Sequence, residues 1–200
     1  MSFNVLVAGA TGKTGQLVID ELIAQGHAPT ALVRAGSDIE TLPEGVALRQ
    51  GDLTALQAGV CQGMDAVVFA AGSGGSTGAD MTEKVDRDGA QKLVDQAREA
   101  GVRRFVMLSS VGADQSDPDG DLAHYLKAKH DADEHLKASG LNFAILRPVA
   151  LSDEDGSDGV VLGADVDKTA TASRADVARL LAVAATTDRF DGAAVDMQSA

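Results

Sequence analysis

A glycine-rich turn near the start of the chain constrains the fold more than any other feature. The apolar run Phe3–Ala8 leads directly into Gly9-Ala10-Thr11-Gly12-Lys13-Thr14-Gly15, and a helix-like stretch follows from Gln16 to Gln25. Strand, glycine turn and helix, in that order, suit a dinucleotide pyrophosphate. Gly9 permits the tight turn, Gly12 lets the backbone approach the phosphates, and Gly15 lets the helix pack closely on the strand. The helix N-terminus offers unpaired N–H groups and a partial positive charge to the anion.

A phosphate-binding loop of the NTPase type is excluded by one residue. Gly12-Lys13-Thr14 resembles the end of the pattern G-x-x-x-x-G-K-[ST], but that pattern requires glycine at position 7, which is Val7 here. Lys13 is therefore expected in the exposed first turn of a helix rather than on a γ-phosphate.

Length and composition indicate one α/β domain that spans residues 1–200. The 44% hydrophobic fraction is ordinary, but aromatic residues make up only 3%, so Ala, Val and Leu must build the core. No apolar run approaches the roughly 20 residues of a membrane span, and no signal-peptide pattern is present. A single Cys61 excludes an intramolecular disulfide and a cysteine metal cluster. These features predict a cytoplasmic protein.

The charge of the chain is strongly acidic. The chain carries 23 Asp and only 7 Lys, and its formal net charge is −13. Such a surface repels nucleic-acid phosphates and anionic lipids, so neither nucleic acid nor a membrane is expected as a partner. Excess Asp with few Lys favours a protein from a salt-loving organism, because high salt screens the self-repulsion. The alternative is an acidic mesophilic enzyme from a GC-rich genome.

Strand-like and helix-like segments alternate at the spacing of βαβ units. This alternation predicts a doubly wound parallel sheet with helices on both faces, the Rossmann arrangement. The expected strands are Phe3–Ala8, Ala28–Arg34, Val46–Arg49, Met64–Ala70, Val102–Leu108, Asn142–Leu146, Val160–Val166 and Ala193–Met197. The expected helices are Lys13–Gln25, Ala55–Gln62, Thr82–Ala100, Leu122–Ser139 and Arg174–Thr186. Residues 71–79, 112–120 and 152–159 are expected as loops, and residues 150–200 as a small substrate-side portion.

Six motifs together resemble one family over essentially the whole chain. They are the glycine turn, Gly51-Asp52-Leu53, the segment from Val102 to Ser110, Tyr125-x-x-x-Lys129, Leu146-Arg147-Pro148, and the segment from Ser173 to Ala178. The chain resembles the atypical short-chain dehydrogenase/reductases, the small NAD(P)-binding group related to NAD-dependent epimerase/dehydratases and NmrA-like proteins. The motifs are specific for the fold and say less about the substrate.

Tyr125 and Lys129 are the candidate catalytic pair. They stand four residues apart on an expected helix and so share one face. A phenol at this place exchanges a proton with a carbonyl or carbinol oxygen, and a neighbouring ammonium favours the phenolate. The resemblance implies that Lys129 also holds the nicotinamide ribose and that Ser110 hydrogen-bonds the reacting oxygen. The chain departs from the family at Asp86, where the family has an Asn that supports a proton relay.

Arg34 predicts the choice of dinucleotide. The strand before it carries no carboxylate at its tip; an acidic residue there binds the ribose hydroxyl of NAD, whereas Arg suits the 2′-phosphate of NADP. Arg34, with Ser37 nearby, therefore favours NADP over NAD. The resemblance implies further cofactor contacts at Thr11, Lys13, Thr14, Asp52, Leu53, Ala70, Ala71, Gly72, Ser109, Pro148 and Val149. No metal site is expected, because His130 and Glu134 share a helix face without an evident third ligand.

The expected function is hydride transfer between NAD(P)H and a small carbonyl or quinone-like substrate, by a monomer or small homo-oligomer. A nucleotide-sugar epimerase or dehydratase is the enzyme alternative; such relatives carry a large C-terminal lobe, and about fifty residues follow Pro148 here. A non-catalytic NmrA-like redox sensor is the third candidate, although such sensors typically lack the Tyr/Lys pair. A flavin-type reductase, which does not need the Tyr, is the fourth.

The acidic composition generates a test of its own. With a net charge of −13, self-repulsion destabilises the fold in dilute buffer, and molar salt screens that repulsion. The melting temperature is expected to rise substantially between dilute buffer and molar KCl in differential scanning calorimetry. A flat or falling curve would favour the mesophilic alternative.

Overall fold

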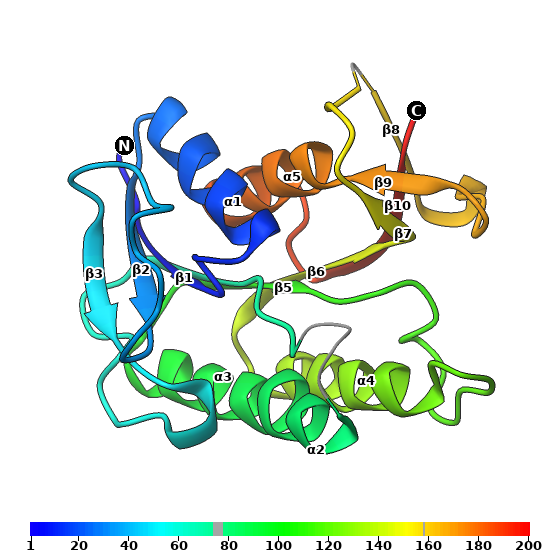
Figure 1. Cartoon of the computed structure of the whole chain (residues 1–200), viewed down its shortest axis with the longest axis horizontal. Coiled ribbons are helices and arrows are strands. Elements are labelled where there is room, and N and C mark those ends of the chain that lie inside the picture. The colour runs from blue at the N-terminus through cyan, green and yellow to red at the C-terminus, as the bar shows by residue number, and fades with distance from the viewer. Residues whose placement is uncertain (74–77, 158) are drawn as a thin grey trace.

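A computed structural model describes residues 1–73, 78–157 and 159–200 of the chain. It is a three-layer α/β structure in which helices cover both faces of a central sheet (Figure 1). The doubly wound fold expected from the sequence is confirmed. In the described part of the chain, no helix is long and apolar enough to cross a membrane.

The order of the strands in the large sheet is β3-β2-β1-β4-β5-β6-β10-β8. Every neighbouring pair in it is parallel except β10 with β8. The strands are β1 (Asn4–Ala8), β2 (Ala28–Val33), β3 (Ala47–Gln50), β4 (Ala66–Phe69), β5 (Arg104–Leu108), β6 (Asn142–Pro148), β8 (Val160–Leu162) and β10 (Ala193–Ser199). From β1 the successive strands β2 and β3 are added toward one edge of the sheet, and from β4 the strands β5 and β6 are added toward the other edge. Ligands of such sheets bind in the crevice at the carboxyl ends of the two strands between which this order reverses, here β1 and β4.

The helices form two separate layers. On one face lie α1 (Lys13–Ala24) and α5 (Arg174–Thr186), which pack against each other; on the other lie α2 (Ala79–Thr82), α3 (Ala90–Glu99) and α4 (Ala123–Ala138) (Figure 1). Alternate residues of β1 pack into different cores on the two faces of the sheet. Val5 and Val7 belong to the core under α1 and α5, and Leu6 and Ala8 belong to the core under α3 and α4. This alternation follows from the period of two along a strand. Both cores consist mainly of Ala, Val and Leu, as the composition requires.

The glycine turn is held by backbone contacts that exclude any side chain. Gly9 has a φ of +81°, and a Cβ added there would lie 2.6 Å from the Cα of Ala71, just after β4. A Cβ on Gly15 would collide with the carbonyl oxygen of Gly9. Gly12 differs, because an added Cβ would meet only that same oxygen, at 3.3 Å. Gly9 and Gly15 are therefore required for packing, whereas Gly12 leaves space beside the turn.

The prediction of a helix at Ala55–Gln62 is wrong. The structure has only the 3-10 turn η1 (Leu53–Ala55), followed by irregular turns. Gly59 and Gly63 adopt φ values of +89° and +75°, which a right-handed helix cannot contain. The guanidinium of Arg49 donates to the carbonyl oxygens of Val60 (2.7 Å) and Gln62 (2.9 Å), so a side chain replaces helical hydrogen bonds there.

The helix expected at Thr82–Ala100 begins earlier and is not uniform. It runs from α2 through a π-helical segment, η2 (Glu83–Gly89), into α3. Sequence periodicity does not reveal this wider turn, which lies next to the candidate site; π-helical turns are frequent at functional sites. The loop expected at 71–79 lies partly outside the described residues, since residues 74–77 are not described, and Ala79 already belongs to α2.

The C-terminal part differs from expectation in two places. The strand expected at Val160–Val166 ends at Leu162, because Gly163 (φ +76°) starts the 3-10 turn η3 (Gly163–Asp165). Two short strands, β7 (Ala150–Ser152) and β9 (Thr171–Ser173), were not predicted; they pair in parallel as a second, small sheet. The loop expected at 152–159 accordingly begins one residue later, and residue 158 lies outside the described residues.

Candidate active site

Two cavities meet at the glycine turn, at the carboxyl ends of β1 and β4. The first, of about 350 Å³, is called here the Arg34 cavity; the second, of about 720 Å³, is called the Tyr125 cavity. Both are lined by Gly12 and by residues 70–73, so the two cavities adjoin at the switch point; together they are called the cleft. Their sizes fall within the usual range of ligand pockets.

Most of the residues singled out from the sequence line this cleft. Those that line the Arg34 cavity are Gly9, Thr11, Gly12, Arg34, Asp52, Leu53, Ala70, Ala71 and Gly72. Those that line the Tyr125 cavity are Gly12, Lys13, Thr14, Ala70, Ala71, Gly72, Ser109, Tyr125 and Lys129. Neither cavity, within the described ranges, is lined by Gly15, Ser110, Pro148 or Val149. Gly15 serves the packing of α1, and Val149 is buried in the core under α1 and α5.

The Arg34 cavity combines one cation with one anchored carboxylate. Asp52 caps η1 by accepting hydrogen bonds from the backbone N–H (2.8 Å) and the hydroxyl (2.7 Å) of Thr54. These bonds, helped by the nearby Arg34, hold the pKa of Asp52 below its usual range. Arg34 itself lies exposed just beyond β2, with Ser37 on the same cavity wall. The Arg34 cavity therefore offers a cationic, solvent-facing group on the same wall as the hydroxyl of Ser37.

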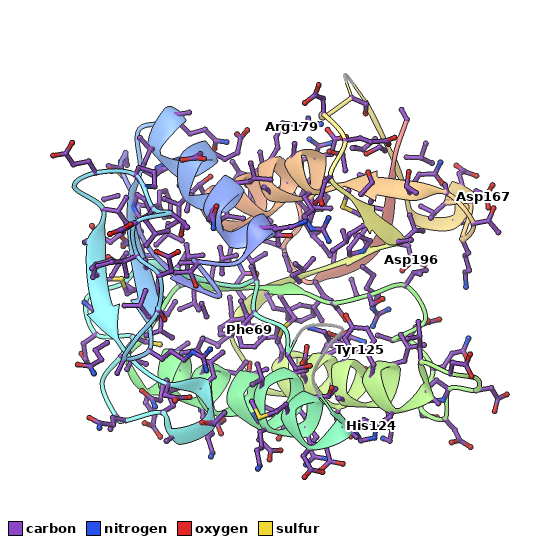
Figure 2. The ribbon with its side chains drawn as sticks, viewed as in Figure 1. Phe69, His124, Tyr125, Asp167, Arg179 and Asp196 are labelled. Carbon is purple, nitrogen blue, oxygen red and sulfur yellow. The ribbon has the colours of Figure 1, made fainter. Side chains whose placement is uncertain are left out.

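Tyr125 lies on the side of α4 that faces the sheet (Figure 2), and Lys129 lines the same cavity. The Lys129 ammonium is 5.7 Å from the centre of the Tyr125 ring and 5.9 Å from that of Phe69. Only 3% of the Lys129 side chain is exposed, and its ammonium donates to the carbonyl oxygen of Leu108 at 3.2 Å. The spacing of four residues thus places both groups in one cavity, as the sequence predicts.

Asp86 is the partner of Lys129, a contact that sequence reasoning missed. The two groups form an ion pair of 2.9 Å, and Asp86 is completely buried on the π-helical segment η2. Its other carboxylate oxygen accepts a hydrogen bond from the backbone N–H of Ser73 (2.9 Å). Burial disfavours the charge on Lys129, but Tyr125, Asp86 and Asp133 outweigh it and raise the pKa of Lys129. Lys129 is therefore a permanent cation at neutral pH.

A second buried polar cluster lies beside Tyr125 and Lys129 on α4 and was also missed. Ser109 donates its hydroxyl to Asp133 (2.9 Å), and Arg147 donates to the same carboxylate oxygen from Nε (3.0 Å) and Nη2 (2.9 Å). Burial raises the pKa of Asp133 despite these donors. Since Asp133 follows Lys129 by four residues on α4, the helix presents Tyr125, Lys129 and Asp133 along one line. The motif Leu146-Arg147-Pro148 could have indicated this cluster from the sequence, because its Arg147 supplies the positive charge of the cluster.

The two serines at the end of β5 have different surroundings. Ser109 lines the Tyr125 cavity, although its hydroxyl is engaged with Asp133. The Ser110 hydroxyl donates to the carbonyl oxygen of Val111 at 3.3 Å. The role expected for Ser110 at the reacting oxygen remains a prediction, and the geometry brings Ser109, not Ser110, to the cavity wall.

The far wall of the Tyr125 cavity comes from the C-terminal part of the chain. Leu151 and Arg174 line it, whereas Pro148 and Val149, expected at the nicotinamide, do not. Cys61 is buried in the core under α3 and α4, outside both cavities, where burial raises the pKa of its thiol to about 12 and so disfavours the nucleophilic thiolate. The functional groups that line the cleft include the phenol of Tyr125, the ammonium of Lys129, the guanidinium of Arg174, the imidazole of His124 and the carboxylates of Asp52 and Asp121.

Comparison with known proteins agrees with this geometry. The sequence model of a family described as NAD(P)H-binding matches residues 9–188. A relative from Bacillus subtilis, named "uncharacterized sugar epimerase YhfK", is 35% identical over 193 residues, which cover 88% of this chain and 85% of the relative.

Two solved structures share the fold over nearly the whole chain. A Bacillus halodurans protein named for the NAD-dependent epimerase/dehydratases superposes with a TM-score of 0.91 at 35% identity and covers 100% of this chain and 95% of its own. The oxidoreductase ylbE from Lactococcus lactis gives a TM-score of 0.84 at 27% identity, with coverage of 98% and 91%.

The space beside Gly12 generates a binding test. Gly12→Val is expected to abolish dinucleotide binding, because the side chain would stand where the pyrophosphate approaches. The melting temperature is expected to change little, since Gly12 has an ordinary φ of −81° and few neighbours. Gly15→Ala is the contrasting variant and should destabilise the protein by about 1–3 kcal/mol through overpacking. Isothermal titration calorimetry with the four nicotinamide dinucleotides measures the first effect; unchanged affinity in Gly12→Val contradicts the site.

Proposed function

The chain belongs to the NAD(P)H-binding family, and from this premise we propose that the protein is an oxidoreductase that transfers hydride to or from a small carbonyl or quinone-like compound. The observation that carries the proposal is the position of Tyr125 and Lys129. Both line the cavity that continues from the glycine turn, so an acid/base group stands where the nicotinamide half of a dinucleotide would end.

The cleft fits a dinucleotide in two respects. The turn leaves space at Gly12 beside the N-terminus of α1, where backbone N–H groups suit a pyrophosphate. The two cavities share one wall at residues 70–73, so the adenosine and nicotinamide halves would occupy opposite sides of the switch point. When bound, the nicotinamide supplies or accepts the hydride.

The residues of the chain supply the proton and its electrostatic environment. Tyr125 would donate its phenolic proton to the oxygen of a carbonyl that is being reduced, or accept it from an alcohol that is being oxidised. The ammonium of Lys129, 5.7 Å from the centre of the Tyr125 ring, would stabilise the phenolate formed in that step. Lys129 has three donor positions; with Asp86 and the carbonyl of Leu108 as two partners, a third can reach a ribose hydroxyl in the cavity.

Asp86 would affect the same reaction indirectly, through its ion pair with Lys129. It pairs with Lys129 and also holds the backbone of Ser73, so it ties α4 to the segment that follows β4. The family Asn that supports a proton relay is thus replaced by a residue that fixes the charge and position of Lys129. We expect the proton from bulk solvent to reach Tyr125 without this residue as a relay.

A sugar epimerase is the second candidate, because the 35%-identical Bacillus subtilis relative carries that name. An epimerase returns the hydride to the same substrate, so it shows no net oxidation of the reduced dinucleotide. A screen of nucleotide sugars by NMR, run beside a screen of carbonyls and quinones by absorbance at 340 nm, separates the two candidates. Isomerised sugar without net dinucleotide consumption would replace the oxidoreductase proposal.

The proposed cofactor is NADP, and Arg34 is the residue that tests it. NADPH is expected to bind more tightly than NADH by about 1.5–3 kcal/mol, the worth of charge-assisted hydrogen bonds to the 2′-phosphate. Arg34→Ala should remove most of that difference and leave NADH affinity unchanged. Equal affinities for NADPH and NADH in the unmodified protein, measured by calorimetry, would refute the preference.

The proton role of Tyr125 is tested by a variant that keeps its ring. Tyr125→Phe is expected to lower kcat by about 10²–10⁴-fold, the usual contribution of a positioned acid/base, with dinucleotide affinity almost unchanged. Lys129→Met should lower both, because it removes the cation and the expected ribose contact. The measurement is steady-state turnover of the best substrate from the carbonyl and quinone screen. A sensor would show no turnover in any variant, and full activity of Tyr125→Phe would remove the tyrosine from the mechanism.

A further inference from the structure

Two cationic side chains converge on one carboxylate at the wall of the Tyr125 cavity. Lys13 Nζ pairs with one oxygen of Asp153, and Arg174 Nη1 pairs with the other. Lys13 is the first residue of α1 and Arg174 the first of α5, and both line the cavity. A chain with a net charge of −13 thus brings two positive charges to the place where the proposed reaction occurs.

The small second sheet fixes this arrangement. β7 and β9 pair in parallel with Ser152 opposite Ser173, so Asp153 and Arg174 leave the sheet side by side. Ser173 then caps α5 by accepting a hydrogen bond from the N–H of Ala175. The position of Arg174 is therefore set by a strand pair on one side and a capped helix on the other.

The contact with Asp153 is one that a ligand can displace. The side chains of Lys13 and Asp153 are 69% and 58% exposed, and ion pairs this exposed contribute little to stability. Arg174 is more enclosed, with 23% of its side chain exposed. The hydrogen bond from Lys13, with the nearby Arg174, holds the pKa of Asp153 below its usual range, so the group is an anion at neutral pH. Asp153 thus pairs with the two cations of the cavity wall that an anionic ligand group could bind in its place.

We propose that Lys13 and Arg174 form a subsite for an anionic group of the substrate, a carboxylate or a phosphate, which displaces Asp153 when the substrate binds. This inference rests on the proposed function and names its substrate class, a small carbonyl compound that carries such a group. Arg174 lines the Tyr125 cavity and not the Arg34 cavity, which places the subsite on the substrate side of the turn. A guanidinium also matches the geometry of carboxylate and phosphate with paired hydrogen bonds.

The experiment uses matched substrates and variants with opposite expected effects. Succinic semialdehyde is compared with butanal, and glyceraldehyde 3-phosphate with glyceraldehyde, in NADPH oxidation. The unmodified protein is expected to favour the anionic member of a pair at least tenfold in kcat/KM. Arg174→Gln should raise KM for that member by about tenfold to a hundredfold, the worth of charge-assisted hydrogen bonds, and leave the neutral member unchanged. Asp153→Asn should lower KM for the same member, because the competing carboxylate is gone.

The control is Arg98→Gln, which removes the same charge from an exposed site on α3 outside both cavities and should change neither substrate. Binding of succinate to the protein saturated with NADP⁺, measured by calorimetry, gives a readout that does not need turnover. If no carbonyl is turned over, the proposed oxidoreductase fails, whereas succinate binding that is lost in Arg174→Gln still supports the subsite. Equal kcat/KM for anionic and neutral members, absence of succinate binding, or an equal loss of NADPH affinity in Arg174→Gln would overturn the subsite.

Discussion

The close approach of backbone segments at the glycine turn is the constraint on which the rest of this structure depends. Gly9 lies against the backbone at Ala71, and Gly15 lies against the carbonyl of Gly9, so β1, α1 and the segment after β4 meet without side chains between them. This contact sets the distance from α1 to the sheet and opens the cleft at the switch point. Both cavities share their walls at this point, and Gly12 is the position of the turn that still faces free space.

Two buried ion pairs made by one helix are the second organising feature. α4 presents Lys129 to Asp86 and Asp133 to Arg147, and each pair joins the helix to a different element. Removing one partner of such a pair costs about 3–5 kcal/mol, because the remaining charge is left buried and alone. These two pairs anchor the face of α4 that carries Tyr125 at the cavity. The cost of burying these charges is consistent with a functional rather than a purely structural role for the cluster.

The distribution of charge across the cleft relates the proposed function to the further inference. The chain as a whole is strongly acidic, yet Arg34, Lys13, Lys129 and Arg174 all line the two cavities. Asp52 and Asp121 line the same cavities, so the cleft presents charges of both signs rather than only the negative charge that dominates the composition. Lys129 is neutralised by buried Asp86, whereas Lys13 and Arg174 share a carboxylate that is largely open to solvent. The buried Lys129–Asp86 pair is suited to hold its charges in place, whereas Lys13 and Arg174 are suited to exchange Asp153 for another anion.

The sequence by itself determined the order of strands and helices, the glycine turn and the helical spacing of Tyr125 and Lys129, because these are local patterns with a fixed period. It failed at Ala55–Gln62, where two glycines with positive φ and the distant Arg49 replace a helix, and at the π-helical segment that buries Asp86. Only the tertiary structure decided the partners of Lys129 and Ser109 and the pairing of β7 with β9 that sets Asp153 beside Arg174. Those contacts join residues far apart in the chain, and no local spacing encodes which side chains meet when the elements pack.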